Sequence, residues 1–315
     1  MFKYKLKIMI KTIFKFCLIA TMFYSNTAFS QGNDTTYQEN DSVNNPLYLN
    51  GYGLHPVLLK QKQSLFQLGI ISPNYYKWYN PKSENLESLS PKMVISETYF
   101  SGKINYGLSD KINIRFLLPV SDLHYYSPMG ISKGIGLDDI KVGIDWNPFS
   151  SNQNGKTNYS VGYTVSCPTG KHYNLESGNL PLGNGTFGLK GNFTGLYKAS
   201  RFNIIYSAYY SYLPNHKSIT KGDKSGAFLI FQKPLNTKVG KFGVETSLFG
   251  YYNNADKENN VQIPNTQNYG VDLSVGAWFN YMKDLTLRFY VPYSVYQNKA
   301  WLTKYEVNLE ITYQF

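Results

Sequence analysis

The sequence predicts an all-β fold: a transmembrane, antiparallel, up-and-down β-barrel of about 12 strands, with short periplasmic turns and long extracellular loops. Three observations predict it. The chain begins with an export signal, its long segments alternate between apolar and polar residues, and its connections alternate between short and long. A closed barrel is the β-architecture that can cross a membrane, because closure leaves no unpaired sheet edge in lipid.

Residues 1–30 form the predicted export signal. They contain five lysines and no acidic residue, then the apolar stretch FCLIATMFY, then Ala28 and Ser30 at the small-residue positions of a cleavage site. This pattern is typical of a secretory signal peptide, here cut after Ser30. Cys17 leaves with the signal and Cys167 remains, so we expect no internal disulfide.

The charge of the exported chain is moderate. Removing five of the 31 basic residues leaves 26 against 20 acidic ones, so the net charge falls from +11 to +6. The basic residues are dispersed and form no nucleic-acid motif, so we expect no nucleic-acid partner. Residues 31–63 are predicted to be a polar N-terminal periplasmic segment, followed by the barrel of residues 64–315.

The predicted strands share a two-residue period. The final segment, YEVNLEITYQF, alternates without exception, and residues 268–281 alternate over their full length. This period indicates strands with one face toward lipid and the other toward a lumen. Many of the segments exceed the roughly ten residues of a tilted membrane crossing. In chain order they cover residues 64–72, 94–107, 111–120, 137–147, 157–168, 185–198, 201–213, 226–234, 239–252, 268–281, 285–295 and 305–315.

The connections between these strands alternate in length. Tight turns are expected at LSDK, KASR, LNTK and MKD, and long loops at the other end of the strands, including residues 73–92 and 121–136. Only the last hairpin, QNKAW, has a short connection where the pattern would place a long one. Short turns at one end and long loops at the other are typical of outer-membrane barrels. An even number of strands would place both ends of the barrel chain on the periplasmic side. We expect the first and last strands to pair, because an open edge is costly in lipid.

The chain ends on aromatic residues. Tyr313 and Phe315 close the last predicted strand. This ending resembles the C-terminal signal of outer-membrane proteins as a class, which implies that barrel-assembly machinery recognises it during biogenesis. The expected location is therefore the bacterial outer membrane, with outer-membrane lipid around the barrel.

The inward positions of the strands predict a charged lumen. Two matching segments, KINIRFLLPVS and DLTLRFYVPYS, place Arg115 and Arg288 inward, and we expect these arginines to form a functional pair. The candidate residues along the solute path are Glu97, Arg115, Asp272, Arg288, Glu306 and Glu310. Other charges predicted to face inward are Lys103, Asp139, Lys141, Asp145, Lys190, Lys198 and Glu245.

Two interpretations of these inward charges remain open. They either select and guide a solute or form ion pairs that brace a barrel narrower than one of 16 to 18 strands. Glu306 and Glu310 are the expected nearest partners of the two arginines. The same matching segments place Pro119 and Pro292 inward, where a proline predicts a local break or bulge in strand pairing.

A resemblance to a known family supports the barrel. GIGLDDIKVGIDW, at residues 134–146, is followed by TVSCPTGKHYN and LPLGNGTFGLKGNFTGLYK. These motifs resemble the outer-membrane transporter family named for the meta-pathway of phenol degradation. The Pro-Thr-Gly at 168–170 and the Gly-Asn-Gly at 183–185 match that family, whereas Asp138 stands where a glycine is usual. The resemblance covers about residues 95–315 and implies a barrel that takes up hydrophobic or aromatic compounds.

No catalytic residue, metal site or cofactor is predicted. His124, His172 and His216 lie in expected extracellular loops and in no serine-hydrolase motif, which disfavours an outer-membrane phospholipase. The sequence contains no close cluster of metal ligands. Two functions remain open: a channel or passive transporter for a small solute of unknown identity, and a closed structural barrel whose long loops serve adhesion or surface interaction.

Overall fold

The structure is a computed structural model, and the predicted signal peptide and the following residues to 57 lie outside its described part. It describes residues 58–80, 85–88, 94–127, 130–148, 157–170, 182, 187–199, 201–214, 219–220, 222–237, 240–258, 261–262, 267–282, 285–298 and 302–315. Its strands are β1 (Ser64–Asn80), β2 (Asn85–Ser88), β3 (Val94–Ser109), β4 (Ile112–Ser127), β5 (Gly130–Leu137), β6 (Ile140–Trp146), β7 (Thr157–Cys167), β8 (Gly188–Lys198), β9 (Asn203–Tyr212), β10 (Ile219–Thr220), β11 (Lys224–Thr237), β12 (Gly240–Asn253), β13 (Lys257–Glu258), β14 (Val261–Gln262), β15 (Asn268–Met282), β16 (Leu285–Asn298) and β17 (Leu302–Gln314).

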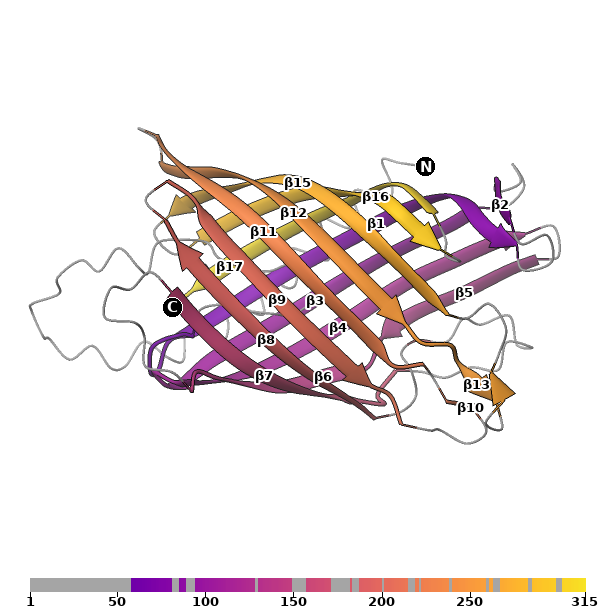
Figure 1. Ribbon diagram of the computed structural model, residues 1–315, viewed down its shortest axis with the longest axis horizontal. Coiled ribbons are helices and arrows are strands. Elements are labelled where there is room, and N and C mark those ends of the chain that lie inside the picture. Colours follow the sequence, from indigo (N-terminus) through magenta and orange to yellow (C-terminus); the bar gives the residue numbers. More distant parts are fainter. Residues whose placement is uncertain are drawn as a thin grey trace, which may run out of the picture. The chain divides into compact units, whose positions relative to one another are not determined.

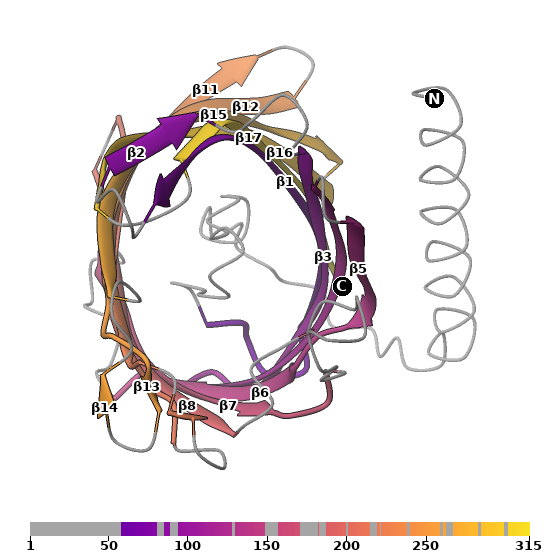
Figure 2. The ribbon, with the colours of Figure 1, turned by 90° about the vertical axis from the view of Figure 1, so that its right-hand side faces the viewer.

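Twelve of these strands form one closed antiparallel barrel (Figure 1). Their order around the ring is β1, β3, β4, β6, β7, β8, β9, β11, β12, β15, β16 and β17, and β17 pairs with β1. Figure 2 shows this ring from one end. The predicted fold class is confirmed, and each of the twelve predicted strands is present.

The two faces of the barrel strands differ as the alternation predicts. On β3, Ile104 is 47% exposed, whereas its neighbours Lys103 and Asn105 face inward and are 3% and 1% exposed. On β15, Leu273 and Val275 face outward, while Ser274 between them is buried. An apolar outer face suits lipid, in which each unpaired polar group would cost several kcal/mol.

Several strands continue past their predicted ends. β1 reaches Asn80 and pairs with β2, and β4 reaches Ser127 and pairs with β5 from Gly130. The long loops expected at residues 73–92 and 121–136 are therefore largely strand, which corrects that prediction. Ladder hydrogen bonds use the backbone, so a strand can continue beyond the apolar side chains that mark a membrane crossing.

Both inward prolines coincide with a change in pairing, as the sequence predicted. β4 pairs with β6 as far as Leu117 and with β5 from Val120, and Pro119 lies between them. β16 pairs with β17 as far as Tyr290, and Pro292 follows. Proline has no N–H to donate to a ladder, so each position suits the point where one neighbour is lost.

The barrel closes between its first and last strands. Their register runs from Leu65 opposite Gln314 to Lys77 opposite Leu302. The Ser64 N–H donates to the Phe315 carbonyl at 2.7 Å, and the Phe315 N–H donates to the Ser64 carbonyl at 2.9 Å. The rings of Tyr313 and Phe315 stack with centroids 5.8 Å apart, and Phe315 is exposed. The role of these two aromatic residues in assembly stays a prediction.

A second, three-stranded sheet joins two connections at the barrel end opposite Ser64 and Phe315. β10 follows β9, and it pairs with β13, which pairs with β14 in the connection between β12 and β15. The Gly222 N–H adds a hydrogen bond to Asp256 Oδ1 at 2.8 Å. Within the described ranges, no helix is long and apolar enough to cross a membrane.

Candidate functional site

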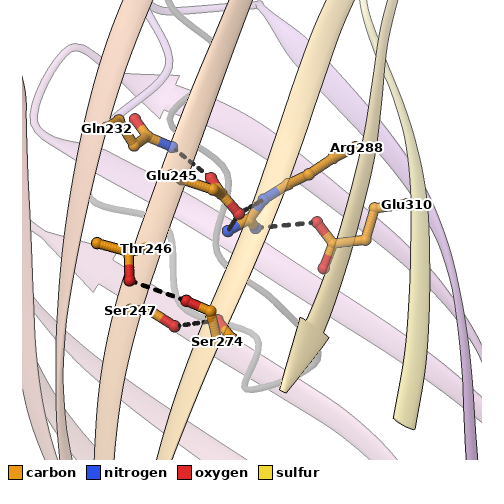
Figure 3. Close-up of polar contacts among 7 residues, drawn as sticks. All are labelled: Gln232, Glu245, Thr246, Ser247, Ser274, Arg288 and Glu310. Carbon is orange, nitrogen blue, oxygen red and sulfur yellow. Dashed lines mark hydrogen bonds and ion pairs between the residues drawn. The ribbon is translucent and has the colours of Figure 1, made fainter. Parts of the chain in front are cut away.

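Arg288 is the centre of one cluster of inward side chains. It lies on β16, between Glu245 on β12 and Glu310 on β17 (Figure 3). Arg288 Nη2 and Nε lie 2.6 and 2.7 Å from Glu245 Oε1, and Arg288 Nη1 lies 3.2 Å from Glu310 Oε2. The three side chains are at most 5% exposed. One guanidinium therefore bridges two carboxylates and leaves one negative charge in excess. We call these three residues the Arg288 cluster.

A glycine makes room for this bridge. β15 lies between β12 and β16, and its Gly276 is opposite Glu245 on one side and Tyr290 on the other. A Cβ on Gly276 would lie 3.1 Å from Glu245 Oε1. Gln232 Nε2 on β11 donates to the second carboxylate oxygen of Glu245 at 3.1 Å. Both oxygens of Glu245 are thus engaged, and the side chains lie against the barrel wall.

Arg115 is the centre of a second cluster, on β4, β6 and β7. Its Nη2 lies 3.1 Å from Asp145 Oδ1 and donates to Thr164 Oγ1, also at 3.1 Å. Gly143 lies between Arg115 and Thr164 in the ladder. A Cβ on Gly143 would lie 2.9 Å from Thr164 Oγ1 and 3.1 Å from Arg115 Nη2. This glycine lets the guanidinium reach across β6 along the wall.

Four cations face the lumen from β3, β4, β6 and β8, and we call them the basic group: Lys103, Arg115, Lys141 and Lys190. Lys190 is close enough to interact electrostatically with the other three. Two carboxylates, Asp139 and Asp145, project inward from the same part of the barrel, and Asp139 Oδ1 accepts a hydrogen bond from the Gly170 N–H at 3.1 Å. The four cations of the basic group and these two carboxylates together carry a net charge of +2.

A second group of acidic residues lies in the other half of the ring. Glu245, Asp272, Glu306 and Glu310 lie on β12, β15 and β17, the strands around Arg288 on β16. The interior is thus electrostatically asymmetric, with one positive and one negative wall. Such a field acts on any charged solute between the walls.

The remaining predicted site residues also lie on the inner wall. Glu97 Oε2 accepts a hydrogen bond from the Tyr99 hydroxyl at 2.8 Å, and Asp272 Oδ1 accepts one from Ser294 Oγ at 2.7 Å. Glu306 Oε1 accepts one from Asn308 Nδ2, also at 2.8 Å. None of these three hydrogen bonds involves Arg115 or Arg288, so the predicted site residues form separate groups along the wall.

The expected partners of the two arginines are correct in part. Glu310 lies against Arg288 as expected, but Arg115 pairs with Asp145 on the neighbouring strand. Glu306 lies four residues from Glu310 on β17, which is about 13 Å along an extended strand. The two arginines therefore occupy different clusters.

Sequence reasoning missed an apolar cluster on the inner wall. It contains Leu196, Ile205, Phe228, Ile230 and Phe249, with Tyr209 and Tyr251 packed against it. The Phe249 ring stacks on Tyr209 and Tyr251, with centroids 6.5 and 5.7 Å apart. These residues lie on β8, β9, β11 and β12. The available signal was the presence of apolar or aromatic residues at inward positions, Ile205 and Tyr209 in FNIIYSAYYSY and Phe228 and Ile230 in AFLIF.

No metal centre is found among the described residues, where no group of three or more His, Cys, Asp or Glu side chains could hold an ion. His124 Nε2 lies 2.6 Å from Asp122 Oδ1 in the extended part of β4. His172 and His216 lie outside the described residues.

The comparisons with known proteins establish the fold. No protein-family model and no curated protein sequence matches the chain. Among solved structures, the chain is similar to the COG4313 outer membrane channel from Pseudomonas putida F1, with 12% identity, a TM-score of 0.68, and coverage of 82% of this chain and 98% of that one.

Two further solved structures match with lower TM-scores. The β domain of the Bordetella autotransporter BrkA matches with 11% identity and a TM-score of 0.46 over 81% of this chain and 100% of that one. The translocator domain of NalP from Neisseria meningitidis matches with 9% identity and a TM-score of 0.45 over 87% and 93%. At 12% identity, the likeness to the COG4313 channel shows the barrel fold alone. The resemblance to the phenol meta-pathway family stays a prediction.

Proposed function

We propose that this chain is a channel of the bacterial outer membrane through which small solutes diffuse passively. The observation that supports the proposal is the inner wall of the closed barrel. Arg115 and Arg288 lie along that wall, where Gly143 and Gly276 make room for them and their partners. A polar interior with an apolar exterior is the arrangement of a membrane channel. The predicted signal peptide supports the proposed location.

The apolar part of the inner wall supports a narrower solute class. The inward cluster around Phe249 offers a surface for hydrophobic or aromatic groups, and mainly polar and charged side chains line the rest of the described lumen. This agrees with the uptake of hydrophobic or aromatic compounds that the family resemblance implies. We propose no catalytic activity and no cofactor.

Assembly of the barrel is part of the proposal. Tyr313 and Phe315 lie on the outer face at the end of β17, where other proteins can reach them. We propose that barrel-assembly machinery binds this end of the chain before the strand is closed. Replacing Phe315 with Ala should then slow insertion in cells while leaving the conductance of refolded barrels unchanged.

Single-channel conductance of the refolded protein in a planar bilayer tests the channel. We expect a steady ion current that changes in both Arg115→Ala and Arg288→Ala. Heat-modifiable migration on detergent gels serves as the folding control, because a closed barrel migrates differently before and after heating. A correctly folded barrel that carries no current would contradict the proposal.

The alternative is a closed barrel that acts through its long connections. Two observations favour it: the lumen arginines are ion-paired, and the β10–β13–β14 sheet ties two long connections together. A silent, folded barrel whose presence on cells increases their adhesion to host or bacterial surfaces would favour this function. Deleting the connection between β12 and β15 should then abolish that adhesion.

A further inference from the structure

We propose that the lumen contains a binding site for a small aromatic carboxylate. The basic group would bind the carboxylate, and the aromatic side chains of the inner apolar cluster would bind the ring. This inference rests on the proposed channel function and deepens it, because it names the chemical class of the solute.

The cationic half of the site follows from strand register. Lys103, Leu117 and Lys141 form one row across β3, β4 and β6. Arg115, Gly143, Thr164 and Lys190 form the adjacent row across β4, β6, β7 and β8. The inward side chains of adjacent rows are about 7 Å apart along a strand. The four cations therefore share one region of wall and repel one another.

The carboxylates already present do not neutralise this region. Asp145 is bound to Arg115 and Asp139 to the Gly170 backbone, and Glu310, which also binds Arg288, interacts electrostatically with Lys103. Three carboxylates, one of them shared with Arg288, therefore oppose four cations. Nearby opposite charge lowers the free energy of closely spaced like charges, and a low-dielectric environment strengthens the effect. A solute anion would supply that charge.

Three inward side chains have donors available for such an anion. Lys103 Nζ and the Nδ2 atoms of Asn105 and Asn113 are buried and have no hydrogen-bond partner among the described residues. The three side chains are at most 3% exposed. Buried donors normally have partners, because an unsatisfied one costs about 1–3 kcal/mol. Asn105 lies in the row next to Lys103, and Asn113 lies in the row after that. A carboxylate accepts several hydrogen bonds, so it suits a wall that presents a lysine and amides in succession.

The aromatic half of the site adjoins the cationic half. Lys190 Nζ lies 4.1 Å from the centroid of the Tyr209 ring, and Tyr209 stacks on Phe249. Lys190 thus belongs to the basic group and also contacts the aromatic cluster. A ring with a carboxylate attached could contact Tyr209, Phe249 or Tyr251 while its charge faces Lys190. A neutral aromatic compound would leave the cations uncompensated, and a small inorganic anion would leave the aromatic faces unused.

Calorimetric titration of the refolded full chain in detergent tests the site with three probes: benzoate, neutral benzyl alcohol and acetate. We expect saturable benzoate binding at least about tenfold tighter than binding of either other probe, because each lacks one half of the recognition. Lys103→Gln and Lys190→Gln should each weaken benzoate binding about tenfold, the loss typical of one charge-assisted hydrogen bond. Lys111→Gln, in an exposed turn, is the matched control and should leave binding unchanged.

The outcomes separate this inference from the channel proposal. Acetate that binds as tightly as benzoate would overturn the aromatic half, and benzyl alcohol that does so would overturn the cationic half. A barrel that conducts ions but binds no benzoate would overturn the site and leave the channel standing. A folded barrel that binds benzoate but carries no current would support the site and refute the channel.

Discussion

Arg115 and Arg288 occupy matching positions in two similar stretches of sequence, yet their surroundings differ. Arg288 bridges two carboxylates and has one acid in excess, whereas Arg115 pairs with one carboxylate and lies among three lysines. The local sequence sets the face of the strand on which each arginine lies. Strands elsewhere in the chain set its charge environment, so the same motif forms part of a negatively charged bridge in one half of the barrel and part of a positive wall in the other.

The largest expected effect comes from breaking the Arg288 cluster. Arg288→Ala leaves Glu245 and Glu310 buried without their cation, and we expect a loss of about 3–5 kcal/mol in the free energy of unfolding. Urea unfolding in lipid vesicles, followed by tryptophan fluorescence, measures it. The triple variant with Glu245→Gln and Glu310→Gln should recover most of the loss. A single variant as stable as the parent would show that the bridge does not stabilise the barrel.

Breaking the Arg115 cluster should cost less. Arg115→Ala removes the partner of Asp145, but Lys103 still interacts electrostatically with that carboxylate. We expect a loss of about 1–3 kcal/mol, together with a shift of ion selectivity toward cations because the positive wall loses one charge. The reversal potential in a KCl gradient measures that shift. Arg288→Ala, on the acidic wall, also removes one positive charge and should shift the reversal potential in the same direction. Shifts of equal size in both variants would argue against two distinct walls.

A smaller change should disturb Arg115 without removing it. Gly143→Ala places a Cβ between the guanidinium and Thr164, and we expect a loss of about 1–2 kcal/mol from the displaced side chain. Gly250→Ala is the matched control, because its Cβ would meet nothing within 4 Å, and its effect should stay within about 0.5 kcal/mol. Similar unfolding free energies for both variants would show that Gly143 is not needed for the reach across β6.

The smallest effect is expected from Thr164→Val. This change keeps the shape of the side chain, suits a strand, and removes one hydrogen bond from Arg115 Nη2. We expect a loss of about 0.5–1 kcal/mol in the free energy of unfolding and an unchanged reversal potential, because no charge is altered. A changed reversal potential would mean that Thr164 controls the position of the guanidinium.

The sequence predicted the faces of the strands well and the partners of the charges poorly. A two-residue period places Arg115 and Arg288 inward without knowledge of any neighbour. Glu245 is 43 residues from Arg288 in the chain, and it reaches the arginine across β15 because of the register and the Gly276 gap. Neither the stagger between strands nor the space above a glycine is visible in a local pattern. Glu310 was found because it lies on the strand that follows Arg288.

Apolar residues at inward positions were missed for a related reason. Ile205 and Phe228 are apolar residues at inward positions, next to apolar residues at outward positions. Where both faces of a strand are apolar, the alternation does not indicate which face is exposed to lipid. The extents of β1 and β4 were underestimated because the alternation of apolar and polar residues is lost in their outer parts. A strand that crosses the membrane needs an apolar face, which gives an alternating sequence. Backbone pairing outside the membrane requires no such alternation.

The seam between β1 and β17 has a consequence for how the protein forms. β17 is matched with β1 over twelve residue pairs but with its sequence neighbour β16 over six. Most of the pairing of the final strand therefore depends on residues near the other end of the barrel chain. Such non-local contacts require closure of a very long loop, which makes them late and slow to form. We infer that the barrel completes in one cooperative final step, and that the last strand stays vulnerable to proteolysis until the first strand meets it.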